Sequence, residues 1–153
     1  MDKNITISPA EWEVMRIVWT LGEAGSTQII NILQHKKKWT ESTIKTLLRR
    51  QVQKGFLKAI RKGRRFIYSA TIDETTMMNI AATTFFNNLC NMKKGHLLVE
   101  LTKQTLMSKT DINDLQKVLQ QKKITAPTTV PCNCIPDKCL QCSITNENKE
   151  EKS

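Results

Sequence analysis

The stretch TESTIKTLLRRQVQKGFLKAIRKGRRFIY, residues 40–68, decides the fold, because it contains the pattern of a helix with two different faces and, directly after it, that of a short hairpin. The helix is predicted to start near Thr40 and to run to about Lys54, where Gly55 stops it. Successive residues of a helix lie about 100° apart around its axis. One side then carries the apolar residues Ile44, Leu47, Leu48 and Val52. The opposite side carries Ser42, Thr43, Lys45, Thr46, Arg49, Arg50 and Gln53. We expect the first side to face a core and the second to be basic and rich in hydroxyl groups.

Two runs of strand-forming residues follow, at 56–60 and 65–69. The segment between them is Arg61-Lys62-Gly63-Arg64, a turn with glycine where a positive φ is needed. A hairpin with a basic tip is predicted, and Lys62 and Arg64 are its candidate contacts with a nucleic acid.

Two further helices are predicted before this stretch. Ser8-Pro9-Ala10-Glu11 has the pattern of a capping box with proline in the first turn. The inward residues of the first helix are predicted to be Ala10, Val14, Ile17, Val18 and Leu21, and Gly22 and Gly25 end it. Those of the second helix, which opens at Ser26 or Thr27, are Ile29, Ile32 and Leu33. Three helices and a hairpin are the layout of a winged helix-turn-helix, whose third helix enters the major groove of DNA.

Helical spacing resumes from Asp73, in three amphipathic segments. Their apolar stripes are Met77, Ile80, Ala81, Thr84, Phe85 and Leu89, then Leu97, Leu98 and Leu101, then Ile112, Leu115, Val118 and Leu119. Such short helices can bury these stripes in an intertwined dimer, although a monomeric helical core remains an alternative. We therefore expect a mainly α protein with a small β-hairpin. Its predicted parts are a winged-helix domain at 1–71, a helical dimerisation domain at 72–124, and a linker with a cysteine-rich tail at 125–153.

The net charge of +10 is concentrated in the winged-helix part. Residues 1–70 hold 14 Lys and Arg against 5 Asp and Glu, whereas residues 126–153 hold 3 against 4. Charge runs often mark only a solvated surface, but here hydroxyl groups accompany the cations and a basic hairpin follows. Arginine can pair with guanine edges, and Ser and Thr can reach phosphates or bases. This pattern favours double-stranded DNA as a partner.

Four of the five cysteines, Cys132, Cys134, Cys139 and Cys142, lie within eleven residues as C-x-C-x4-C-x2-C. Four thiolates this close can surround one tetrahedral Zn(II), and the same soft ligands favour Cu(I). A redox switch and a permanent structural zinc site remain alternatives. The fifth cysteine, Cys90, is expected to be a small buried hydrophobic residue, and His35 and His96 to be ordinary helix-surface residues.

Other classes of protein are disfavoured by what the sequence lacks. It has no glycine-rich phosphate loop, H-E-x-x-H or G-x-S-x-G motif, so we expect no enzyme. It has no run of roughly 20 apolar residues and no signal-like N-terminus, so we expect a cytoplasmic protein without a membrane partner.

Residues Ile7 to Met15 with Trp19, and Thr43 to Arg50 through Lys54-Gly55, resemble the BlaI/MecI penicillinase-repressor family. The resemblance extends through the hairpin to Tyr68 and, more loosely, to about Lys123. It implies a homodimer that represses transcription from palindromic operators. Carried over by position, the recognition-helix contacts are Ser42, Thr43, Lys45, Thr46 and Arg50. Arg49 lies at the edge of that face and could contact a phosphate or nothing.

The cysteine tail resembles that of the CopY-type copper-responsive repressors of this family, whose pattern is C-x-C-x4-C-x-C. The resemblance implies a Zn(II)-loaded dimer on the operator that is released when Cu(I), which a copper chaperone could supply, takes the thiolates. The genes controlled would encode copper-export ATPases and copper chaperones. This chain has Leu140 and Gln141 between its last two cysteines, one residue more than that pattern, which leaves the copper stoichiometry open.

Two other functions remain open at this point. In the first, the repressor is inactivated by proteolysis, as penicillinase repressors are, and any zinc is structural. In the second, the protein buffers or carries copper and uses the winged helix only for protein contacts.

Overall fold

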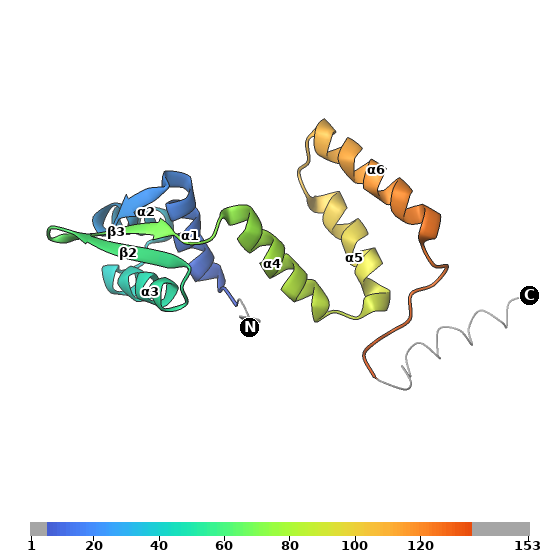
Figure 1. Ribbon diagram of the computed structural model, residues 1–153, viewed down its shortest axis with the longest axis horizontal. Helices are drawn as coiled ribbons and strands as arrows, with labels where there is room; N and C mark the ends of the chain where they lie inside the picture. The colour runs from blue at the N-terminus through green and yellow to red at the C-terminus, as the bar shows by residue number, and fades with distance from the viewer. Residues whose placement is uncertain (1–5, 136–153) are drawn as a thin grey trace, which may run out of the picture. The chain divides into compact units, whose positions relative to one another are not determined.

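The computed structural model describes residues 6–135 and divides into two compact units, one ending at Thr84 and one starting at Phe85. Figure 1 shows the succession of elements along the chain. The helices and strands of the first unit are α1 (Pro9–Leu21), β1 (Glu23–Gly25), α2 (Ser26–Lys37), α3 (Glu41–Gln53), β2 (Leu57–Lys62), β3 (Arg65–Ala70) and most of α4 (Glu74–Asn87). The second unit holds the end of α4, then α5 (Asn91–Gln104) and α6 (Lys109–Thr125). The mainly helical winged fold expected from the sequence is confirmed, while the three domain boundaries stay predictions.

Both ends of α1 follow the predicted chemistry. The backbone N–H of Glu11 donates to the Ser8 hydroxyl at 3.2 Å, and the Ser8 N–H donates to the Glu11 carboxylate at 2.9 Å. This reciprocal pair satisfies two amide groups that the first turn would otherwise leave unpaired. Gly22 ends the helix with a φ of 76°, a value that residues with a Cβ rarely adopt.

The sheet has three antiparallel strands in the order β1-β3-β2. The predicted hairpin is present, with Ile60 opposite Ile67 and Lys62 opposite Arg65, and Gly63 turns the chain with a φ of 64°. Strand β1, where Ala24 pairs with Tyr68, was not predicted from the sequence. Three residues are too few to show an alternating pattern, and their partner strand lies more than 40 residues away.

The core of the first unit lies between α1, α2, α3 and the sheet. Its fully or almost fully buried apolar side chains include Val14, Met15, Val18, Ile29, Leu33, Ile44, Leu48, Leu57 and Met77. Three expectations were wrong. Leu21 and Val52 are exposed, and Met77 belongs to this core rather than to a dimer stripe. Gln51 takes the buried place predicted for Val52, because at about 100° per residue it lies roughly 20° from Ile44 around the helix, whereas Val52 lies roughly 80° away at the edge of the inward face.

The helices α5 and α6 bury none of their residues within the single chain. Several large apolar side chains on them are exposed, among them Leu98, Val99, Val118 and Leu119, each by about half of its surface. No helix within residues 6–135 has both the length and the apolar character that crossing a bilayer would require.

Candidate nucleic-acid interface and cysteine cluster

The candidate recognition helix, α3, is started by its N-cap residue. The Thr40 hydroxyl accepts the backbone N–H of Thr43 at 3.2 Å, and the two threonine hydroxyls lie 2.9 Å apart. The inward residues Ile44, Leu47 and Leu48 pack into the core and so fix the rotation of the helix. The opposite face is therefore held toward solvent.

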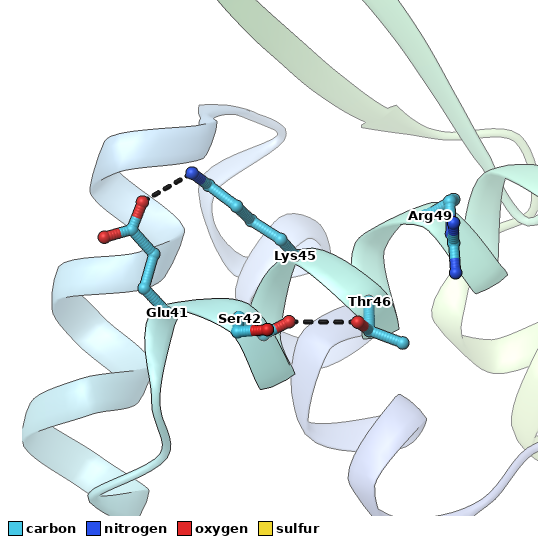
Figure 2. A pocket seen from close by; sticks show the side chains of 5 residues that line it. All are labelled: Glu41, Ser42, Lys45, Thr46 and Arg49. Atoms are coloured by element: carbon cyan, nitrogen blue, oxygen red, sulfur yellow. Dashed lines mark hydrogen bonds and ion pairs between the residues drawn. The ribbon is translucent and has the colours of Figure 1, made fainter.

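That outer face carries residues predicted from the sequence to contact DNA, with Glu41 beside them. Glu41, Ser42, Lys45, Thr46 and Arg49 line an open hollow of about 440 Å³ on the surface of α3 (Figure 2). The Lys45 ammonium pairs with Glu41 at 2.5 Å, and the Thr46 hydroxyl donates to the Ser42 carbonyl at 3.0 Å.

The other residues predicted to contact DNA lie on α3 itself or on the hairpin formed by β2 and β3. Thr43 and Arg50 are exposed on α3, and Lys62 and Arg64 are exposed on either side of Gly63. The Arg61 guanidinium donates to the Gly63 carbonyl at 3.1 Å, which braces the turn. Among residues 6–135, Arg49, Arg50, Lys62 and Arg64 form no ion pair, so their charges are available to a polyanion.

The sheet adjoins the basic face at Tyr68 of β3. Burial raises the pKa of its phenol, and the nearby positive charge of Lys45 only partly opposes that effect. Elsewhere in the unit, Lys36 and Lys37 both lie within 3.1 Å of the Glu13 carboxylate, and among the described residues Lys38 forms no ion pair. The unpaired positive charge is thus concentrated on α3 and the hairpin.

A cluster of three thiols forms the second candidate site, within the second unit. The sulfurs of Cys90, Cys132 and Cys134 all lie within 4.8 Å of one another, and the Sγ atoms of Cys90 and Cys132 are 3.5 Å apart. Cys139 and Cys142 lie outside the described residues. Within residues 6–135, this is the one group of His, Cys or acidic side chains spaced to hold a metal ion. His35 and His96 are exposed and outside it, as expected.

The expectation that Cys90 is a small buried hydrophobic residue was wrong, because its side chain is only half-buried. Cys90 is the half-buried N-cap residue of α5, at the corner that follows α4. The helical stripe ends before it, at Leu89, and a cysteine just ahead of a helix is a weak signal in a sequence. No spacing rule could pair it with Cys132, because 42 residues separate them.

The thiols perturb one another. Hydrogen bonding from Cys132 is the main cause that lowers the pKa of Cys90 to about 7, and the backbone N–H groups at the start of α5 contribute. Hydrogen bonds with Cys132 and Cys90 raise the pKa of Cys134 to about 12.

Comparison with known proteins gives consistent results. The sequence pattern of the family described as "Penicillinase repressor" matches residues 7–121. An uncharacterized 16.5 kDa protein from the ptsI 3′ region of Latilactobacillus sakei is 52% identical, over 87% of this chain and 91% of its own length. The penicillinase repressor of Bacillus licheniformis is 30% identical, over 80% of this chain and 96% of its own length. Among solved structures, the DNA-binding domain of the repressor BlaI is 37% identical, covers 49% of this chain and 92% of that chain, and superposes with a TM-score of 0.45.

Proposed function

Because this chain belongs to the penicillinase repressor family, we propose that it is a copper-responsive transcriptional repressor that binds a palindromic operator as a homodimer. The observation that carries DNA binding is the outer face of α3. It presents Lys45, Arg49 and Arg50 together with hydroxyl groups, on a helix whose rotation is fixed by its buried face. Such a face can enter the major groove, while Lys62 and Arg64 of the hairpin contact phosphates.

The homodimer is supported by the state of α5 and α6. Neither helix buries a residue within its own chain, and both expose apolar side chains such as Leu98 and Val118. Large apolar side chains exposed along two successive helices are typical of an interface between subunits. A two-fold dimer would also present two copies of α3 to the two halves of a palindrome.

The metal response is supported by the chemistry of the cysteine cluster. We propose that Cys132, Cys134, Cys139 and Cys142 hold Zn(II) in the DNA-bound form. Of these, Cys132 and Cys134 lie in the described residues and have close sulfurs. Thiolates are strong ligands of Zn(II) and stronger ones of Cu(I), so that Cu(I) is a suitable inducer at the same sulfurs. Copper binding is then expected to lower operator affinity.

The test is a titration of operator binding with each metal. The DNA upstream of the protein's own gene should be bound by the zinc-loaded dimer and released by micromolar Cu(I), with metal content measured in parallel. Replacing the four tail cysteines with serine should leave DNA binding insensitive to copper.

Each other outcome favours a different function. Release that survives the fourfold serine variant would indicate inactivation by proteolysis with a structural zinc. Tight copper binding without any DNA binding would indicate a copper-buffering or carrier protein. Equal affinity for the operator in the metal-free, zinc-loaded and copper-loaded states would overturn the proposal.

A further inference from the structure

We propose that Cys90 is a further ligand of the metal site, so that a bound ion joins the cysteine tail to the corner between α4 and α5. The inference rests on the proposed metal-binding function of the tail and adds a ligand from outside the tail. It also identifies the place in the helical unit at which the metal would act.

The distances between the sulfurs fit a shared ion. Sulfurs that surround a tetrahedral Zn(II) at about 2.3 Å lie about 3.8 Å from one another. The Sγ atoms of Cys90 and Cys132 are 3.5 Å apart, and Cys134 lies within 4.8 Å of both. Small side-chain rotations are enough to turn this group into three corners of one coordination sphere.

One hydrogen bond that involves no sulfur also holds the tail against α5. The backbone N–H of Asn91 donates to the side-chain carbonyl of Asn133 at 2.9 Å. The Lys94 ammonium donates to the side-chain carbonyl of Asn91 at 2.7 Å, on the same turn. Because Asn133 lies between Cys132 and Cys134, this docking brings both thiols beside Cys90.

The place of Cys90 suits a negatively charged ligand. It is the N-cap residue of α5. The first turn of a helix carries partial positive charge, which stabilises a thiolate. Lys93 and Lys94 follow at once and add positive charge to the same turn.

The additional ligand gives a route by which metal occupancy reaches the dimer. An ion bound only within the tail would place no metal–ligand bond at the start of α5, whereas an ion that includes Cys90 ties the tail to that helix through the metal as well as through the Asn91–Asn133 hydrogen bond. That helix exposes Leu98, Val99 and Leu101, which we assign to the proposed subunit interface. Cu(I) accepts fewer sulfurs than Zn(II) does, so an exchange of the metals changes how the tail is tied to α5.

The first test measures the protection of each thiol in the full-length protein. Zn(II) alone is added, the protein is treated with iodoacetamide, and alkylation of each cysteine is followed by peptide mass spectrometry. We expect Cys90 to react at least tenfold more slowly with Zn(II), and to lose this protection in the Cys132→Ser/Cys134→Ser variant. Unchanged reactivity of Cys90, together with a protected Cys132, would overturn the inference.

The second test counts thiolate ligands with Co(II) as a substitute for Zn(II). In the Cys90→Ser variant, the intensity of the sulfur-to-cobalt charge-transfer absorption should fall by about the contribution of one thiolate. The variant should also bind Co(II) more weakly. Serine is among the best N-cap residues, so this variant should keep α5 intact. Asn88→Ser, close to Cys90 but outside the cluster, is the matched control and should keep the full absorption. An unchanged spectrum in Cys90→Ser would contradict the inference.

The two proposals can fail separately. If copper releases the operator from the wild type and from Cys90→Ser alike, and Cys90 is not protected, the repressor function stands and the additional ligand is wrong. If Zn(II) protects Cys90 but no metal changes operator binding, the additional ligand stands and the copper-responsive function is wrong.

Discussion

The Lys54 ammonium lies 2.7 Å from a carboxylate oxygen of Glu11 and so ties the end of α3 to the first turn of α1. Glu11 is almost fully buried and also accepts the backbone N–H of Ser8, while Lys54 donates to the Thr6 carbonyl at 2.9 Å. The rotation and position of the candidate recognition helix therefore depend in part on this ion pair.

Removing the cation should destabilise the winged-helix unit. Lys54→Met leaves the buried Glu11 carboxylate without its charged partner, and we expect a loss of about 1–2 kcal/mol, because Lys54 is partly solvated. Urea denaturation followed by circular dichroism measures the change. Lys58→Met on the exposed side of β2 is the control. If both variants lose the same stability, the ion pair contributes nothing specific.

The same carboxyl group should make stability depend on pH. Burial alone would raise the pKa of Glu11, but the bonds from Lys54 and Ser8 outweigh it and hold this pKa below its usual value of 4.5. The contribution of Glu11 is therefore complete above the unfolded-state pKa and is lost as the pH falls through the lower, folded-state pKa. Glu11→Gln should show a smaller loss of unfolding free energy between neutral and acid pH. Identical pH profiles would refute this assignment.

Gln51 should be replaceable with a gain in stability. Its side chain is fully buried, and neither its amide nitrogen nor its oxygen has a hydrogen-bond partner among the described residues. Gln51→Leu removes two desolvated polar atoms, and we expect it to raise the free energy of unfolding by about 1–2 kcal/mol. Thermal denaturation measures the effect. Gln53→Leu, on the exposed face, should change little; a loss of stability in Gln51→Leu would mean that its amide is bonded.

Operator affinity should depend on the cations of the outer face of α3. Lys45→Ala and Arg50→Ala should each weaken binding, by about tenfold or more where a bidentate base contact is lost. Fluorescence anisotropy at several salt concentrations separates the two roles, since loss of a phosphate contact lowers the salt slope by about one. Lys109→Ala at the start of α6 should bind normally. An equal loss in that control would point to net charge alone.

Glu41 should act in the opposite direction. It holds Lys45 in an ion pair and adds negative charge to the face that would meet DNA. Glu41→Gln frees the lysine and keeps the size of the side chain, so operator affinity should rise severalfold, most clearly at low salt. Lys45→Ala should abolish most of that gain. A weaker operator complex in Glu41→Gln would show that the carboxylate itself contacts a base.

Local signals predicted much of the winged-helix unit. The Ser8–Glu11 capping box, the two faces of α3 and the Gly63 turn all depend on residues close in sequence, and each is present. β1 depends on pairing with the distant strand β3. The burial of Met77 depends on how the start of α4 packs against the rest of the first unit. Cys90 is the largest omission, because its neighbour Cys132 is close only after the tail folds back. Periodicity carries no information about such contacts.

The indole rings of Trp12 and Trp19 in α1 meet edge to face, with centroids 5.5 Å apart. The Trp19 ring nitrogen donates to the Ile72 carbonyl at 2.8 Å, and Trp39, the third tryptophan of the chain, also packs on the core of the first unit. The intrinsic fluorescence of this protein therefore originates wholly in its winged-helix unit. Melting of that unit can be watched optically without a label, while thiol reagents report independently on the half that carries the cysteines.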